Sequence, residues 1–540
     1  MKTHPLKFGV TVVALAVLLA GATGAAPQET LHKVWAIKGC RIVVRPGSVV
    51  AEGTVLVRDG LIEAAGAGVA VPKDAEVIDG STLTVYPGLF DGLGKSLLKL
   101  PEKKYDPSKV YTGQYTDADR GITPELKACD HFQISKGQLE KHHKFGITTA
   151  HVMPERGIFT GQASVFSLCG TDRNEDLLLK NTCLGIGFSY ASFMVYPSSL
   201  MGVVALIRQE LADAARFDLH RRRWESGMNG IPRPVHQPPA EVLADFATGK
   251  RPVVFLCQSQ HDIRRALRLA EEFDLDFFIA DLGNEAFRVV SELKKARARM
   301  LLPVTFKAPS TSVYAQKGRQ EREQAEKELY VRNPAALEKA GVRFAFVSLG
   351  VDDPQDFIEG VRKAIEAGLS REAALAALTE VPAAYFGLER ALGTVEPGKI
   401  ANLVLAEGDI FDPEAKVRTV FADGKRFEIE EARVKEGEKP AVNISGKWEI
   451  TIAEAGLKIT ADFVQEGAAL SGKITTPFGI FDFSGGTVSG NEVYFEMSIS
   501  AGGQEIDLYF SAVVEDDRMT GTVVQGTQGS AEFTAKRIPG

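Results

Sequence analysis

The sequence predicts an α/β protein: a (β/α)8 TIM-like barrel with a flanking small β-sandwich, plus a C-terminal all-β domain. Over residues 86–392, short apolar strands alternate with amphipathic helices, which is typical of parallel α/β folds and long enough for such a barrel. Short strands bounded by turn residues lie on both sides of this region, at 27–85 and 393–425. Over residues 443–540, apolar and polar residues alternate between glycine turns, which predicts a small β-barrel or sandwich.

The N-terminus has the pattern of a secretory signal peptide. Lys2 and Lys7 flank the start of an apolar stretch over residues 8–19, and small residues follow over 21–26. The alternative is a membrane anchor that stays uncleaved, but the stretch is shorter than the roughly 18 apolar residues of a membrane span. We therefore expect residues 1–26 to be removed, leaving a periplasmic or secreted protein without a membrane partner.

Charge and cysteine usage narrow the function classes. The 540-residue chain has a net charge of −7 and a pI near 5.9, so no basic surplus is available for a nucleic-acid partner. Its five cysteines are widely spaced and form no CxxC pair, which argues against a zinc knuckle. We expect buried, reduced thiols, although an oxidising compartment would allow one or two disulfides. The five are Cys40, Cys129, Cys169, Cys183 and Cys257.

The segments before and after the central region have similar strand patterns. A β-branched run at 41–44 and the hairpin signal Asp59-Gly60 lie in the first segment. A similar apolar run at 401–405 lies in the second. Short strands are therefore predicted in both segments, and a charged linker is expected at 426–442.

Two long loops are expected to interrupt the central region, at 101–124 and 216–250. The second contains the basic run Arg221-Arg222-Arg223 and a proline cluster. Long loops in such a barrel usually lie at one face and shape its mouth. We interpret the basic run as part of a solvated loop rather than as an anion site.

Sequence motifs frame the central region at both ends. Residues 78–91, with Ile78-Asp79-Gly80 and a Tyr-Pro-Gly-Leu-Phe-Asp run, resemble the entry to the barrel in the amidohydrolase superfamily. Residues 378–404 resemble the superfamily's exit signature, and the resemblance as a whole covers about 35–425. This signature implies that the segments 27–85 and 393–425 form one composite β-sandwich. The C-terminal β domain lies outside it. Three shorter motifs, at 146–149, 157–162 and 196–202, resemble the exported, imidazolonepropionase-like branch.

The resemblance implies a metal site whose ligands are missing from this chain. Superfamily members hold one or two divalent metals with histidines and a carboxylate at the mouth of the barrel; the metal activates a water, and a strand-8 aspartate takes its proton. Leucine has no lone pair to donate, so we expect no cofactor and a patch of converging leucines instead. Carried over one by one, the ligand positions fall on Leu93 and Lys95 in the first strand, Leu256 in the fifth, Leu282 in the sixth and Leu349 in the eighth.

Nearby histidines and aspartates are the candidates for a rebuilt site. Adjacent histidines on a helix point about 100° apart and rarely share a metal. We therefore expect His142 and His143 to lie on a solvated helix. The full set of candidates is His142, His143, His151 and His261, with Asp352 or Asp353 in place of the lost aspartate.

Lys95 is the one ligand position that carries a charge. Its ammonium is expected near the mouth, where a cation lies in the metal-containing relatives, and a carboxylate partner would stabilise it there. Two further interpretations stay open: the side chain reaches out to water, or burial lowers its pKa and makes it a nucleophile. The expected carboxylate partners are Asp91, Asp281, Asp352 and Asp353; the candidate catalytic residues are Lys95, Asp352 and His151.

Two functional hypotheses follow. In the first, the chain is an amidohydrolase-family protein that has lost its metal ligands and serves as a non-catalytic binding or assembly subunit, beside a metal-containing amidohydrolase paralogue or by self-association. In the second, it is an active hydrolase of carbon–nitrogen bonds other than peptide bonds, with zinc or another divalent metal in a rebuilt site or with a metal-independent site. The five replaced positions favour the first hypothesis.

Overall fold

The computed structural model describes most of the chain outside its N-terminus. The predicted signal peptide, residues 1–26, lies outside the described residues. Among the helices of the described part, none is long and apolar enough to cross a membrane. The described residues are 34–101, 113, 115–190, 194–306, 327–429, 439–452, 457–476, 479–501, 504–525 and 529–538.

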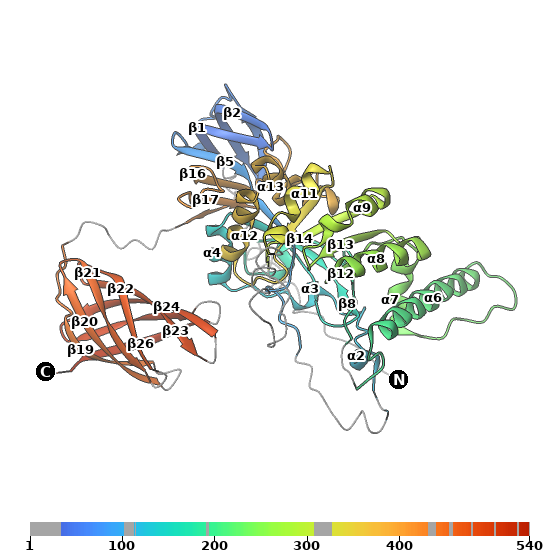
Figure 1. The fold of residues 1–540 in the computed structure, drawn as a ribbon. Coiled ribbons are helices and arrows are strands. Elements are labelled where there is room, and N and C mark those ends of the chain that lie inside the picture. Colours follow the sequence, from blue (N-terminus) through green and yellow to red (C-terminus); the bar gives the residue numbers. More distant parts are fainter. Residues whose placement is uncertain are drawn as a thin grey trace, which may run out of the picture.

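One eight-stranded sheet combines the segments that precede and follow the central region (Figure 1). Its order is β18-β17-β16-β5-β1-β2-β3, with β4 paired to β1. The antiparallel pairing of β5 with β16 joins the two segments. Because β18 extends to Glu428, the first residues of the expected linker belong to this sheet. The strands are β1 (Val34–Arg45), β2 (Ser48–Arg58), β3 (Leu61–Gly66), β4 (Ala75–Asp79), β5 (Leu83–Pro87), β16 (Leu403–Glu407), β17 (Lys416–Ala422) and β18 (Lys425–Glu428).

Turn chemistry sets the hairpins of this sheet. Asp59 and Gly60, between β2 and β3, both have positive φ angles of 52° and 81°. Asp423 and Gly424 repeat the arrangement between β17 and β18, with φ angles of 51° and 72°. Such Asp-Gly pairs match the right-handed twist of the flanking strands, which explains why this hairpin could be read from the sequence.

The central region has two sheets, ordered β10-β9-β7-β6 and β15-β14-β13-β12-β11-β8. The pairs from β11 to β15 and the pair β6–β7 are parallel. Strands β8 and β9 are separated by Ala163 alone and run antiparallel to their neighbours. At the other side β6 meets β15, where Ser348 donates hydrogen bonds to the carboxylate of Asp91. The strands are β6 (Leu89–Gly94), β7 (Ile147–Val152), β8 (Phe159–Gln162), β9 (Ser164–Ser167), β10 (Leu177–Leu179), β11 (Leu184–Gly187), β12 (Val253–Cys257), β13 (Phe277–Asp281), β14 (Arg299–Pro303) and β15 (Phe344–Val347).

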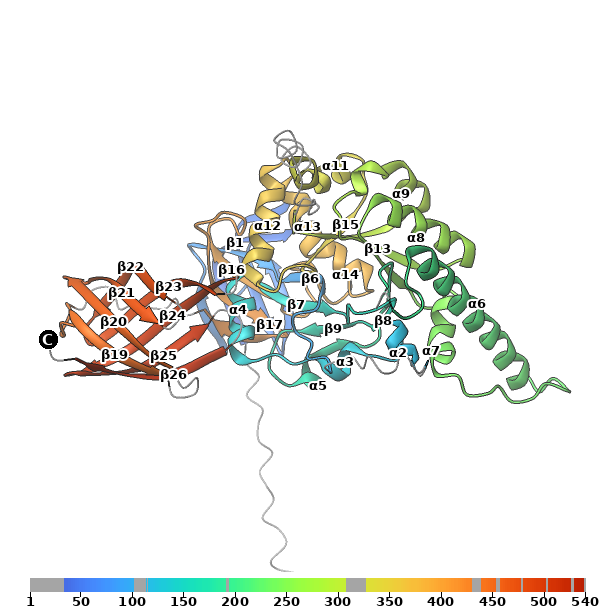
Figure 2. The same cartoon turned by 60° about the horizontal axis from the view of Figure 1, so that its bottom comes forward.

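Helices lie outside these strands (Figures 1 and 2). In α8, Ser259 caps the N-terminus by accepting from the Asp262 N–H, and a stripe that includes Ile263, Ala266 and Leu269 is buried. The helices are α2 (Asp117–Arg120), α3 (Ala128–His131), α4 (Lys136–Lys144), α5 (Arg173–Asp176), α6 (Leu200–Glu225), α7 (Pro238–Ala247), α8 (Gln260–Phe273), α9 (Val290–Ala296), α11 (Asn333–Lys339), α12 (Pro354–Glu366), α13 (Arg371–Leu378) and α14 (Glu380–Tyr385).

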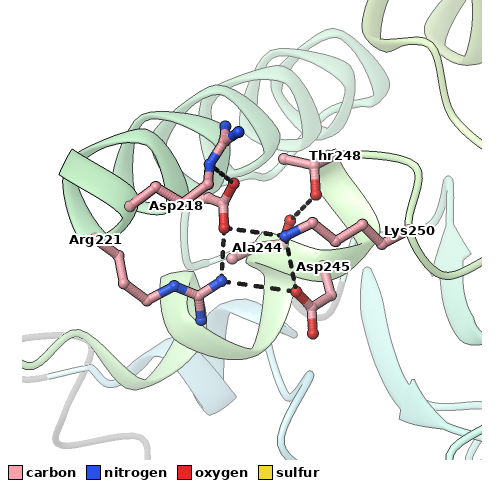
Figure 3. Close-up of polar contacts among 7 residues, drawn as sticks. Asp218, Arg221, Ala244, Asp245, Thr248 and Lys250 are labelled. Carbon is pink, nitrogen blue, oxygen red and sulfur yellow. Dashed lines mark hydrogen bonds and ion pairs between the residues drawn. The ribbon is translucent and has the colours of Figure 1, made fainter. Parts of the chain in front are cut away.

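The expected loop at 216–250 is largely helical, so that prediction was wrong. The basic run lies at the end of α6, and it pairs with acidic side chains between α6 and α7 (Figure 3). The fully buried carboxylate of Asp218 lies 2.6 Å from Arg221, 2.9 Å from Arg222 and 3.3 Å from Lys250. Burial alone would raise the pKa of Asp218, but the hydrogen bonds from Arg221 and Lys250 outweigh it and lower that pKa. The arginines therefore stabilise a helix pair and are not parts of a solvated loop.

The C-terminal region is a closed eight-stranded antiparallel barrel, which confirms the expected all-β domain (Figure 1). Each strand pairs with the next, and β26 returns to β19. Burial alternates along β20, as a barrel wall with one apolar face requires. Stacked rings at 4.6 Å centroid distances join Phe483 to Phe495 and Phe495 to Phe510, so aromatic side chains form its core. Its strands are β19 (Gly446–Ile452), β20 (Leu457–Glu466), β21 (Ala469–Thr476), β22 (Gly479–Ser489), β23 (Glu492–Ala501), β24 (Gln504–Glu515), β25 (Arg518–Gln525) and β26 (Gly529–Arg537).

Candidate functional site

Four leucines from four strand ends meet in one hydrophobic cluster of the central region, here called the leucine cluster. Leu93 lies in β6 and Leu256 in β12, while Leu282 and Leu349 follow β13 and β15. Leu93, Leu256 and Leu349 are buried, and Leu282 is half-buried against them. Other members of the cluster, such as Met153, are also apolar. The four positions do lie together, whereas their descent from metal ligands stays a prediction.

The residues of the leucine cluster do not fit a divalent metal. Protein sites for zinc need imidazole, thiolate or carboxylate donors, and leucine side chains supply none of these. Within the described ranges, no group of three or more His, Cys, Asp or Glu side chains is arranged to hold a metal ion. We therefore derive no metal-dependent step at this position.

His151 lies closest to a metal-ligand role, but both of its ring nitrogens are engaged. Nδ1 lies 2.9 Å from the carbonyl oxygen of Gly92, so it must carry the proton and donate. Nε2 then accepts from the Thr182 hydroxyl at 2.7 Å. The imidazole is fully buried and contacts the Phe386 ring, and this burial lowers the pKa of His151 to about 4. It is a neutral core histidine without a free lone pair for a metal.

The other histidines do not join this site. His142 and His143 are buried, contrary to the expectation of a solvated helix, because α4 packs them inward. His143 donates from Nε2 to the Leu168 carbonyl at 2.7 Å and contacts the Phe427 ring of β18. Burial lowers the pKa of His143 to about 4, and it also lowers the pKa of His142. His261 is exposed on α8.

Lys95 pairs with a carboxylate that sequence reasoning missed. Its Nζ lies 2.6 Å from Oε2 of Glu155, which follows β7, and the two side chains are 38% and 31% exposed. The pairs expected with Asp91, Asp281, Asp352 and Asp353 are not formed. A lysine becomes a nucleophile when it is buried away from water, and the Lys95 side chain is too accessible for that role.

Asp352 and Asp353, the candidates to replace the missing aspartate, lie at the start of α12. Asp353 accepts from the Gln355 N–H as the N-cap and pairs with Lys141 at 2.5 Å. Asp352 is exposed. Neither side chain belongs to the leucine cluster, and the structure does not bring Asp352, Lys95 and His151 together as one catalytic group.

Residues 320–431 match the model of the Amidohydrolase family. The chain is therefore similar to amidohydrolases over this segment. No curated protein sequence matches it. Among solved structures, an amidohydrolase from Thermotoga maritima MSB8 is similar, with 24% identity, a TM-score of 0.61, and coverage of 73% of this chain and 99% of that one. At this identity the likeness concerns the fold.

Two further solved structures are more distant. A Xaa-Pro dipeptidase with bound methionine in its active site has 14% identity and a TM-score of 0.43, covering 73% of this chain and 100% of that one. An adenosine deaminase from Xanthomonas campestris with bound zinc has 15% identity and a TM-score of 0.42, covering 73% and 92%. We infer nothing from these two, because both scores are low.

Two buried aspartates lie within β6 and at the end of β13. Asp91 Oδ1 accepts from the Ser348 N–H at 2.9 Å and the Leu93 N–H at 3.2 Å, and Oδ2 accepts from the Ser348 hydroxyl at 2.5 Å. Asp281, at the end of β13, accepts from two backbone N–H groups and from the Asn333 amide. Burial raises the pKa of both carboxyls to about 6. Both were expected from the sequence as partners of Lys95, but here they accept hydrogen bonds that hold β6, β13 and the segments beside them in place.

The five cysteines are all free, and four of them are buried. Burial raises the pKa of Cys183 to about 12, although its Sγ lies 3.8 Å from Nε2 of His151. A thiol that stays protonated is a poor nucleophile, so this pair does not resemble a reactive cysteine site.

Proposed function

We propose that this chain is an exported amidohydrolase-superfamily protein that acts as a non-catalytic binding or assembly subunit. In this proposal the strands β6 to β15 make up a (β/α)8-type barrel whose mouth has lost its metal ligands. The leucine cluster carries the proposal: it places apolar side chains where the resemblance implies metal donors. An apolar, closely packed mouth excludes water, so a metal-bound hydroxide would have no place to form.

The polar groups around the mouth support the same proposal. Asp91, Asp281 and His151 each bind protein partners through the atoms that would otherwise hold a ligand. Lys95 has its own carboxylate in Glu155. A catalytic group needs a free lone pair or proton aimed at a substrate, and these side chains use theirs within the protein.

An assembly role fits a group of exposed apolar side chains around the start of α6. Tyr190, Tyr196, Leu200 and Met201 lie within twelve consecutive residues, and Met201 is 84% exposed. Large exposed apolar side chains in close sequence are typical of interaction surfaces. The proposed partner is a metal-containing amidohydrolase paralogue or a second copy of this chain, in the periplasm or outside the cell.

Metal content tests the proposal most directly. Protein purified without chelator and lacking residues 1–26 should contain far less than one equivalent of zinc, iron or manganese by mass spectrometry. His151→Gln and His261→Gln should leave that content unchanged. One tightly bound equivalent that either substitution removes would overturn the proposal and restore the metal-dependent hydrolase.

A metal-independent hydrolase is the second candidate, and one contact favours it. The Ser348 hydroxyl lies 2.5 Å from Asp91 Oδ2 at the strand ends, so the carboxylate could take its proton as a general base. Turnover of an acyclic or cyclic amide that disappears in Ser348→Ala, and persists with chelator, would establish this candidate. The absence of turnover across a panel of such amides would leave the non-catalytic role.

A further inference from the structure

The cavity that stands out in the described part of the chain lies away from the leucine cluster. It has a volume of about 520 Å³ and lies where the end of α4 meets α12 and the segment that leads into β17. None of its lining residues belongs to the leucine cluster. Its size is that of ordinary small-molecule sites in proteins.

The walls of this cavity combine apolar side chains with charged groups, and most of the charged groups are cationic. Three cations, Lys144, Arg362 and Lys416, face one carboxylate, Glu359. That carboxylate accepts a hydrogen bond from Gln355 at 3.2 Å. The apolar lining includes Phe145, Ile358, Ile410, Val417 and Ile429.

Arg362 is held in place without a counter-charge. Its Nε donates to the carbonyl of Phe411 at 3.1 Å, and its Nη2 donates to the carbonyl of Asp412 at 3.0 Å. No carboxylate of the described residues forms an ion pair with it. Backbone carbonyls fix the plane of a guanidinium but leave its charge uncompensated, and a partly buried cation of this kind is stabilised by an anion.

Lys144 adds a second cation from another element. It is the last residue of α4 and is exposed, and the described residues include no carboxylate within ion-pair distance of it. An anion placed beside Arg362 could therefore meet an ammonium from α4 as well as the guanidinium from α12. The apolar walls would cover the remainder of the same ligand.

We propose that this cavity binds a small amphipathic carboxylate, a medium-chain acid or a molecule of similar chemistry. The carboxylate binds the guanidinium of Arg362, with Lys144 as a second cation, and the apolar body lies against Phe145, Ile358 and Val417. Planar guanidinium groups bind carboxylates through parallel hydrogen bonds, which gives the head group its preference. The inference does not depend on whether the barrel mouth is catalytic.

The test separates the head group from the body. Isothermal titration of the full mature chain uses three probes: octanoate, octanol with the same body and no charge, and acetate with the charge and no body. Octanoate should bind at least tenfold more tightly than either of the others. If octanol binds as tightly as octanoate, the cavity recognises only the apolar body. If acetate binds as tightly as octanoate, the binding reflects unspecific attraction to surface cations. Either result, or no octanoate binding, overturns the proposal.

Substitutions locate the binding. Arg362→Met should weaken octanoate binding about tenfold or more, since a charge-assisted hydrogen bond is lost. Lys144→Met removes a cation without disturbing a structural contact, so it remains informative if Arg362→Met fails to fold, and it should weaken binding severalfold. Arg208→Met, at a surface ion pair with Glu272 on α6 and α8, is the matched control and should leave binding unchanged. Unchanged octanoate binding in Lys144→Met and in folded Arg362→Met would place the ligand elsewhere and refute this site.

Discussion

Replacing Asp91 with asparagine is expected to change the pH dependence of stability more than stability itself. The carboxylate accepts three hydrogen bonds, two from Ser348 and one from the Leu93 N–H. The side-chain oxygen of asparagine can still accept from the N–H groups of Ser348 and Leu93. Its amide nitrogen can donate to the hydroxyl oxygen of Ser348. Every contact keeps a partner, so at the pH where wild-type Asp91 is protonated the cost should stay within about 1 kcal/mol.

The pH effect follows from the raised pKa of Asp91. Burial raises that pKa from its ordinary value of 3.8 to about 6, so the folded state binds the proton more tightly than the unfolded state does. The stability that this group contributes is fully present below pH 3.8 and is lost as the pH rises through 6. A shift of about two pKa units corresponds to about 3 kcal/mol. The free energy of unfolding of Asp91→Asn should therefore rise relative to wild type by about 3 kcal/mol from low pH to pH 7.

Hydrogen exchange measured by mass spectrometry suits this prediction. A chain with several separately packed regions does not unfold in one transition, whereas exchange reports on individual strands. Peptides from β6 and β15 should show the pH-dependent difference after correction for intrinsic exchange. Asp462→Asn, at an exposed position of the C-terminal barrel, is the control and should give curves parallel to wild type. Parallel curves for Asp91→Asn as well would refute the buried contact between β6 and β15.

Three other substitutions test the remaining parts of the site and fold. Lys95→Met should change the melting temperature little, by the equivalent of at most about 1 kcal/mol, because its pair with Glu155 is exposed; a larger loss would mean a buried, structural charge. Asp218→Asn should destabilise the α6–α7 pair by about 1–2 kcal/mol, discounted because its partners are partly exposed, and the fluorescence of Trp224 in α6 during urea unfolding would report it. Leu256→Ala should cost about 2–5 kcal/mol in denaturant unfolding, and a near-neutral result would show that the leucine cluster is loosely packed.

Local signals explain what could be predicted from the sequence. The Asp59-Gly60 hairpin and the alternation along the C-terminal strands depend on neighbouring residues alone, and both are present in the structure. The pairing of the first segment with the strands after residue 400 followed from the resemblance rather than from local pattern. The convergence of the four leucines could be predicted only from two observations together. The resemblance supplied the four positions, and the sequence has an apolar residue at each of them.

Long-range contacts explain what could not be predicted. Lys95 and Glu155 lie sixty positions apart, and nothing near either residue indicates the other. The end of α6 was missed because the buried stripe that includes Leu211 and Ala214 reaches Asp218, a charged residue at a core position. Its partner Lys250 lies 32 residues away, beyond α7. A buried charge breaks the apolar pattern that identifies a helix, and its compensation cannot be seen until the fold is known.

The leucine cluster also bears on whether a metal site could be introduced at these positions. Full burial of a leucine contributes about 1.5–3 kcal/mol, so the three fully packed members together contribute an amount comparable to the net stability of a small domain. A single histidine introduced at Leu93, Leu256 or Leu349 would lose that packing and would bury an imidazole with no metal and no hydrogen-bond partner. Each single step is therefore unfavourable, and only several simultaneous replacements, together with carboxylates to orient the new histidines, would provide a ligand set. The packing of the leucine cluster therefore opposes the stepwise introduction of metal ligands at these positions.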